Sequence, residues 1–80
     1  MLMPTVMNID GYRFFFFAHE GNEPPHIHVE KAGQEAKFWL DPPRLARNHG
    51  FAAHELRIIA RHVHDNKGRL LEAWNARNFD

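Results

Sequence analysis

Residues 24–30 decide the fold, and they read Pro-Pro-His-Ile-His-Val-Glu. At the two-residue period of a β-strand, Ile27 and Val29 point to one face. The opposite face then carries three polar side chains, His26, His28 and Glu30. We expect a half-buried strand here, because the double proline removes two backbone donors and stiffens the entry to the strand.

Three more stretches have the composition of strands. The predicted strands are Met3–Ile9, Tyr12–Ala18, His26–Lys31 and Glu35–Asp41. Asp10 and Gly11 are turn-formers, so a tight hairpin should join the first two strands. A second turn is expected over residues 32–34, which read Ala-Gly-Gln. The pattern indicates two antiparallel hairpins.

The second predicted strand is apolar on both faces. Phe14 and Phe16 point to one side, while Phe15 and Phe17 point to the other. Such a strand is typical of the centre of a sheet that is covered on both sides. One cover would be the chain's own helix, and the other a second subunit, a partner or a substrate. The alternative is a small sheet with some exposed aromatic side chains.

The fourth predicted strand alternates cleanly. Ala36, Phe38 and Leu40 share one face, and Lys37, Trp39 and Asp41 share the other. If Ile27 and Val29 join the same core as Phe38, then both histidines share a face with Lys37 and Trp39. A slip of one residue in the pairing would reverse this assignment.

The C-terminal part has helical periodicity. Pro42 and Pro43 should end the sheet, and Arg44–Asn48 is expected to form a helical turn. From Ala53 onward, apolar residues recur at three, four or seven positions: Leu56, Ile59, Val63, Leu70 and Trp74. We predict one long helix to Asn78, because this stripe stays in phase across Gly68. The expected fold is α+β, an antiparallel sheet of four strands with one long helix on one face (ββββα).

Length and composition restrict the class of protein. The 80 residues predict a single domain over 1–80 with a modest core, so we expect a homodimer or a bound partner. The absence of cysteine excludes disulfides and thiolate metal sites, and a net charge of +0 argues against strong non-specific attraction to nucleic acid. Because signal-peptide features and membrane-length apolar runs are missing, we expect a cytoplasmic protein that does not contact a membrane.

The two histidines of the third strand are the candidate catalytic or metal-binding groups. His26 and His28 project the same way, so they could bind one metal ion or act as a paired acid and base. A zinc ion would need a third ligand from His19, Glu20 or Glu30. Because the downstream ligand spacing of zinc sites is missing, we expect no metal and no cofactor.

As an acid/base pair, the histidines would lie beside Lys37 and Arg13. One imidazole would take a 2′-hydroxyl proton, the other would protonate the leaving oxygen, and a cation would stabilise the phosphorane. The candidate binding residues on this face are Phe15, Phe17, Glu30 and Trp39, of which Phe15 or Trp39 would stack on a base. The alternative is that the histidines are only polar residues on an exposed or partner-facing strand.

The outer face of the predicted helix carries a mildly basic stripe. It consists of His54, Arg57, Arg61 and His64. We expect a solvated face, and contact with nucleic acid is the alternative.

Seven short stretches carry a family resemblance. They are residues 3–6 (Met-Pro-Thr-Val), 11–16 (Gly-Tyr-Arg-Phe-Phe-Phe), 23–29 (Glu-Pro-Pro-His-Ile-His-Val), 36–40 (Ala-Lys-Phe-Trp-Leu), 50–51 (Gly-Phe), 55–56 (Glu-Leu) and 71–75 (Leu-Glu-Ala-Trp-Asn). With these stretches in order over nearly its whole length, the chain resembles the small bacterial proteins classed as domain of unknown function 4160. The family is uncharacterised, so the resemblance supplies no catalytic residues.

The resemblance implies a gene context, and this sequence differs from the usual family pattern at two positions. Family members look like components of bacterial toxin–antitoxin-type gene pairs, beside a small protein of another uncharacterised family, domain of unknown function 2442. This context favours a protein bound to a cognate small partner. Ala52 stands where members often carry a helix-capping serine, and Gly68 interrupts a stretch that is usually a good helix-former.

Three hypotheses follow from the sequence. The first is a toxin–antitoxin component that acts on RNA through His26 and His28, with Lys37 and Arg13. The second is a non-catalytic binding module whose aromatic sheet face docks a cognate small protein or a second copy. The third is a metal-binding domain that uses the two histidines and an acidic residue.

Overall fold

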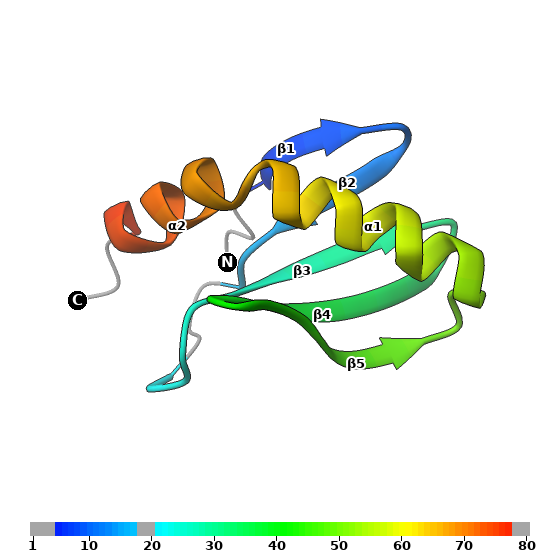
Figure 1. Cartoon of the computed structure of the whole chain (residues 1–80), viewed down its shortest axis with the longest axis horizontal. Helices are drawn as coiled ribbons and strands as arrows, with labels where there is room; N and C mark the ends of the chain where they lie inside the picture. Colours follow the sequence, from blue (N-terminus) through cyan, green and yellow to red (C-terminus); the bar gives the residue numbers. More distant parts are fainter. Residues whose placement is uncertain (1–4, 18–20, 78–80) are drawn as a thin grey trace.

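The described residues fold into five strands followed by two helices (Figure 1). The computed structural model describes residues 5–17 and 21–77. The elements are β1 (Thr5–Ile9), β2 (Tyr12–Phe15), β3 (His26–Lys31), β4 (Gln34–Leu40), β5 (Pro43–His49), α1 (Ala53–Asp65) and α2 (Lys67–Ala76). The strands lie in the order β1-β2-β3-β4-β5, and each neighbouring pair is antiparallel. The α+β class is therefore confirmed, but the numbers of strands and helices differ from the expectation.

The fifth strand corrects the prediction of a helical turn over Arg44–Asn48. These residues belong to β5, which pairs with β4 from Leu40 opposite Pro43 to Glu35 opposite His49. Pro43 did not end the sheet, because the first residue of an edge strand needs no backbone donor. The preceding peptide bond, Asp41–Pro42, is cis and lies in the turn between the two strands.

The helix does not run unbroken from Ala53 to Asn78, and the break lies at Asn66 rather than at Gly68. The backbone N–H of Asn66 and its side-chain amide both donate to the carbonyl oxygen of His62, at 3.0 and 2.9 Å. An asparagine side chain that bonds to the preceding turn competes with helix continuation, so it ends α1. Asn78 lies outside the described residues.

The predicted hairpin turns are present. Asp10 and Gly11 have φ angles of 54° and 82°, the left-handed pair that a tight two-residue hairpin requires. Ala32 and Gly33 repeat this geometry at 52° and 81°, so β4 begins at Gln34, inside the turn expected over residues 32–34. The second predicted strand is too long, because β2 ends at Phe15 and leaves Phe16 and Phe17 outside the strand. The predicted end residues Met3 and Ala18 lie outside the described residues.

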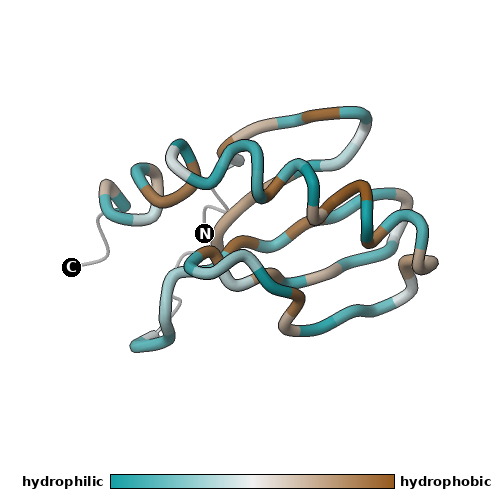
Figure 2. Tube along the Cα trace, in the orientation of Figure 1, coloured by the Kyte–Doolittle hydropathy of each residue, from teal (hydrophilic) through white to brown (hydrophobic). Residues whose placement is uncertain are grey.

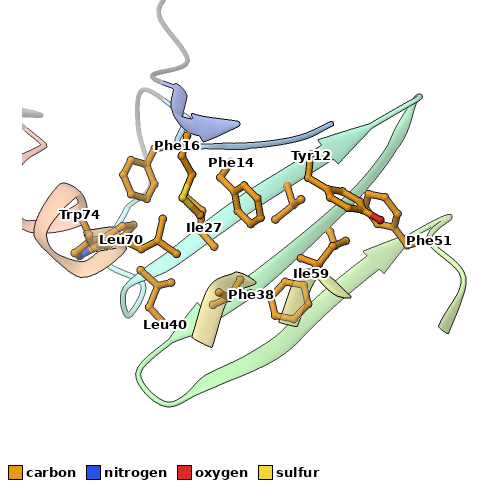
Figure 3. Packing of buried hydrophobic residues seen from close by; sticks show 14 residues of the cluster. Tyr12, Phe14, Phe16, Ile27, Phe38, Leu40, Phe51, Ile59, Leu70 and Trp74 are labelled. Atoms are coloured by element: carbon orange, nitrogen blue, oxygen red, sulfur yellow. The ribbon is translucent and has the colours of Figure 1, made fainter. Parts of the chain in front are cut away.

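Both helices pack on one face of the sheet, and their apolar stripe forms the core (Figure 3). The fully buried side chains of this core include Phe14, Ile27, Val29, Leu40, Ile59, Val63 and Leu70. The stripe predicted for one helix therefore continues from α1 into α2, and Ile27 and Val29 share the core with Phe38 and Leu40 as expected. Along α1, hydrophobic and hydrophilic residues alternate as in an amphipathic helix (Figure 2).

Polar contacts tie α1 to the first hairpin. The Tyr12 hydroxyl donates to a Glu55 carboxylate oxygen at 3.4 Å, and Nε2 of His62 lies 3.0 Å from a carboxylate oxygen of Asp10. Burial raises the pKa of Tyr12 above 10.0, and the charge of Glu55, its hydrogen bond and the charge of Asp10 raise it further. No helix within the described residues has the length and apolar composition needed to span a bilayer.

The start of α1 lacks a side-chain cap, because the N-cap residue is Ala52. Its backbone N–H donates to a Glu55 carboxylate oxygen at 3.5 Å, so half of a capping box is already present. Ala52→Ser supplies the other half, because the hydroxyl accepts a hydrogen bond from the N–H of Glu55. We expect the free energy of unfolding to rise by about 1 kcal/mol, measured by urea denaturation.

The matched control is the same exchange inside the helix, at the exposed Ala60. Ala60→Ser should lower the free energy of unfolding by up to about 0.5 kcal/mol, because serine has the weaker helix propensity. Equal stabilities of the two variants would contradict the capping account.

Candidate functional site

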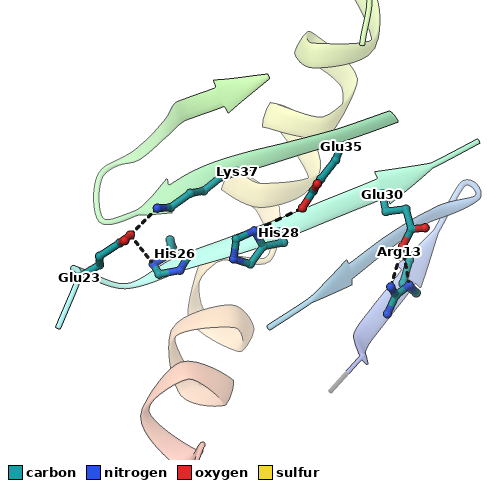
Figure 4. A network of polar contacts seen from close by, with 7 residues as sticks. All are labelled: Arg13, Glu23, His26, His28, Glu30, Glu35 and Lys37. Carbon is teal, nitrogen blue, oxygen red and sulfur yellow. Dashed lines mark hydrogen bonds and ion pairs between the residues drawn. The ribbon is translucent and has the colours of Figure 1, made fainter. Parts of the chain in front are cut away.

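The candidate site lies on the sheet face turned away from the helices, which we call the open face (Figure 4). Its members are Arg13, Phe15, Phe17, His26, His28, Glu30, Glu35, Lys37 and Trp39. The register places His28 opposite Phe15 on β2 and opposite Lys37 on β4, and it places His26 opposite Trp39. Both histidines therefore share a face with Lys37 and Trp39, as predicted from the alternation.

The ring of His28 is enclosed by aromatic neighbours. Its centroid lies 4.5 Å from that of Phe17, 5.6 Å from that of Phe15 and 5.2 Å from that of His26. Only 3% of the residue is exposed. Nδ1 lies 3.8 Å from a carboxylate oxygen of Glu35, which belongs to the neighbouring strand β4. His28 is thus part of a packed aromatic layer.

His26 is completely buried, with 0% exposure. Its ring centroid lies 4.8 Å from that of Trp74 and 5.8 Å from that of Trp39. Nδ1 lies 2.9 Å from the carbonyl oxygen of Pro24, and since a carbonyl only accepts, this nitrogen carries the proton. Trp74 comes from α2, so the helix closes the end of the sheet beside His26. The second of the two prolines, Pro25, links this segment to β4, because its carbonyl oxygen accepts a hydrogen bond from the N–H of Leu40 at 3.0 Å.

Lys37 is 8% exposed and forms an ion pair with Glu23. Its ammonium also lies 4.7 Å from the ring centroid of Trp39, where a cation is attracted by the π-face. The same Glu23 oxygen lies 3.8 Å from Nδ1 of His26 (Figure 4). Glu23 thus lies between the lysine and the first histidine.

Arg13 is held at the other end of the open face. Nη2 and Nε donate to one carboxylate oxygen of Glu30 at 2.6 and 3.1 Å, and Nη1 donates to the Thr5 hydroxyl at 3.1 Å. The guanidinium carbon lies 4.1 Å from the ring centroid of Phe15. Sequence reasoning placed Arg13 on this face correctly, but its contacts with described residues are with β1, β2 and β3 side chains rather than with the histidines.

A hollow of about 260 Å³ opens beside the aromatic layer. Phe15 and Phe17 form its apolar wall, and Arg13, Glu30 and Glu35 supply charges of both signs around it. Sequence reasoning missed Glu23 and Glu35. Glu23 stands in the Glu-Pro-Pro-His stretch, and Glu35 directly opposite Glu30 in the β3–β4 register, but only the three-dimensional structure shows which partners they contact.

The described residues contain no group of three histidine, aspartate or glutamate side chains that could hold a metal ion. Glu30, one of the expected third ligands, is paired with Arg13. The other two, His19 and Glu20, lie outside the described residues. The part of the site that the structure describes is therefore an aromatic layer bordered by ion pairs.

A family model described as a domain of unknown function (DUF4160) matches residues 11–75. The chain belongs to this family. The match runs from the turn before β2 into the last turn of α2, so it includes every residue of the open face. The DUF4160 resemblance found in the sequence is confirmed. Comparison with the curated proteins gave no match, and comparison with the solved structures gave none either.

In this DUF4160 chain, His26 is expected to stabilise the fold. His26→Ala removes a buried ring that contacts two tryptophans, and it leaves a cavity. We expect a loss of about 3 kcal/mol in the free energy of unfolding, measured by urea denaturation with tryptophan fluorescence.

The matched control is His49→Ala, because His49 lies exposed on the edge strand β5. That substitution should change the free energy of unfolding by less than about 0.5 kcal/mol. If the two alanine variants were equally stable, His26 would have no packing role.

Proposed function

We propose that this protein is a non-catalytic binding module that docks a second small protein on its open face. The observation that carries the proposal is the burial of the two histidines, which are 0% and 3% exposed. An acid or base must reach the proton that it transfers. Buried imidazoles packed among Phe17, Trp39 and Trp74 stabilise the sheet instead. The exposed parts of the open face around them are then available for binding.

The open face has the composition of a docking surface. Both helices pack on the opposite face (Figure 1), and α2 touches the open face at one end, where the ring of Trp74 contacts that of His26. Phe17 and Trp39 are partly exposed, and aromatic side chains supply much of the binding energy in protein interfaces. The hollow beside Phe15 and Phe17 has room for an apolar side chain of a partner. Glu35 at its border would pair with a positive charge next to that side chain.

The proposed occupant is a cognate small protein encoded beside this one, as in a toxin–antitoxin-like gene pair in the cytoplasm. The family resemblance supplies this choice, and the mixed charges of the open face agree with a protein surface better than with a polyanion. A second copy of the chain is the other occupant that the test must separate.

RNA cleavage is the second candidate function, and one observation favours it. The rings of His26 and His28 lie 5.2 Å apart, and Lys37 stands opposite His28 on the next strand. These are the groups that metal-independent cleavage needs. The reaction would require the aromatic side chains and Glu23 to move away from both imidazoles, so we rank it below binding.

The binding proposal predicts a complex that depends on two aromatic residues. The protein is co-expressed with the product of the adjacent gene, and the complex is measured by light scattering and calorimetry. Phe17→Asp and Trp39→Asp should each weaken it about tenfold or more, because a carboxylate would be buried in an apolar contact. Ile58→Asp is the control, since Ile58 is 41% exposed on α1 and lies away from the open face.

Three results would contradict the proposal. The first is a complex that survives both substitutions on the open face. The second is a monomer that binds neither the neighbouring product nor itself. The third is cleavage of single-stranded RNA by the purified protein that disappears with His28→Ala. If the protein forms a homodimer that Phe17→Asp dissociates, the open face is still the docking surface, but its occupant is a second copy of the chain.

A further inference from the structure

The lysines and arginines of the described chain fall into two groups. Six of them contact an internal acceptor or acid: Arg13, Lys31, Lys37, Lys67, Arg69 and Arg77. Four make no ion pair or hydrogen bond with the described residues, and all four are exposed: Arg44, Arg47, Arg57 and Arg61. These four lie on only two elements, β5 and α1. Arginines without a described internal partner are therefore confined to the edge strand and the neighbouring helix of a chain whose net charge is +0.

A groove of about 190 Å³ lies between β5 and α1 on the same side. Phe38, Leu45 and Leu56 give it an apolar floor, and Arg44 and Arg57 stand along it, one from the strand and one from the helix. Leu45 is 41% exposed, which is unusual for a leucine beside the core. The groove therefore combines an open apolar floor with two cations.

β5 is also the last strand of the sheet, and no strand of the described residues lies on its outer side (Figure 1). An edge strand presents backbone N–H and C=O groups to which another extended segment can pair. The strand has seven residues, enough for a short peptide to pair along it. Ala46 is an extra residue of β5 at the register shift between Lys37 and Phe38, so the strand edge is locally bent there, and a partner strand would pair on either side of it.

We propose that the edge of β5 and the adjoining groove bind an extended acidic segment of a partner protein. The segment would add a strand beside β5, place an apolar side chain over Leu45 and Leu56, and pair its carboxylates with Arg44 and Arg57. Guanidinium groups suit this task because they bind carboxylates with two parallel hydrogen bonds. The groove lies between β5 and α1 and shares no lining residue with the open face, although Arg44 lies opposite Trp39 in the register, so the inference does not depend on the function proposed above.

A second copy of the chain fits this surface poorly. Pairing β5 with the β5 of another copy would bring its arginines close to one another, and like charges across a strand pair are destabilising. Nucleic acid would use the arginines, but it would leave the apolar floor and the backbone donors of the strand edge unused. Acidic side chains alternating with apolar ones match all three features. Of the four arginines, Arg57 and Arg61 belong to the basic stripe of the predicted helix, for which the sequence indicated only a solvated face.

The test selects binders from a display library of random short peptides, with the purified full-length protein as the target. Enriched peptides should alternate acidic with apolar residues, and they should shift the amide NMR signals of β5 and α1. Arg44→Glu and Arg57→Glu should each weaken such a peptide about tenfold. The matched control is Arg69→Glu, because Arg69 is exposed on α2 and lies outside the groove.

The substituted arginines are exposed, so the variants should fold. Unchanged amide NMR signals of β3 in each variant check this. Four results would overturn the proposal: no enriched peptide, enriched peptides without acidic residues, binding that survives both charge reversals, or single-stranded RNA that binds the same arginines more tightly than any peptide. Loss of the open-face complex with Phe17→Asp would leave peptide binding intact, so the two proposals fail separately.

Discussion

The rest of the structure depends on how the ring of His26 is packed. The ring lies between Trp39 of β4 and Trp74 of α2, and Nδ1 donates to the carbonyl oxygen of Pro24. One side chain thus joins the entry to β3, the neighbouring strand and the last helix. Because a buried polar group without a hydrogen bond is costly, the backbone must deliver the Pro24 carbonyl to this place. The stiff double proline before the strand makes that geometry reproducible.

The two faces of the sheet differ in composition. The helices cover one face with apolar side chains, while the open face is filled by histidine and phenylalanine rings and bordered by ion pairs. Lys37 and Arg13 have the right charges for catalysis, but Glu23 and Glu30 already hold them. Side chains that stabilise each other in this way fit the recognition surface proposed above. The arginines without a described internal partner lie on β5, beside Trp39 and Lys37 of the open face, and on α1.

Much of this arrangement could be predicted from the sequence, because strand alternation fixes faces. The bounds of β3 and the grouping of His26 and His28 with Lys37 followed from the two-residue period. β5 was missed because its proline and its arginines lack the pattern of a strand, and only pairing with β4 determines its conformation. The break at Asn66 was missed because a side-chain bond to His62 leaves the apolar stripe in phase. The burial of His26 depends on Trp74, a contact across 48 positions of sequence that no local pattern contains.

The measurement that tests this account most directly is the rate at which each histidine reacts with diethyl pyrocarbonate, followed by mass spectrometry of the folded protein. His49 and His54 are exposed and serve as internal references. We predict that His26 and His28 react at least about tenfold more slowly than these references, because their reaction requires the site to open. If either buried histidine were modified as fast as His49, the ring would be open to solvent, and the account of a closed, non-catalytic layer would be wrong.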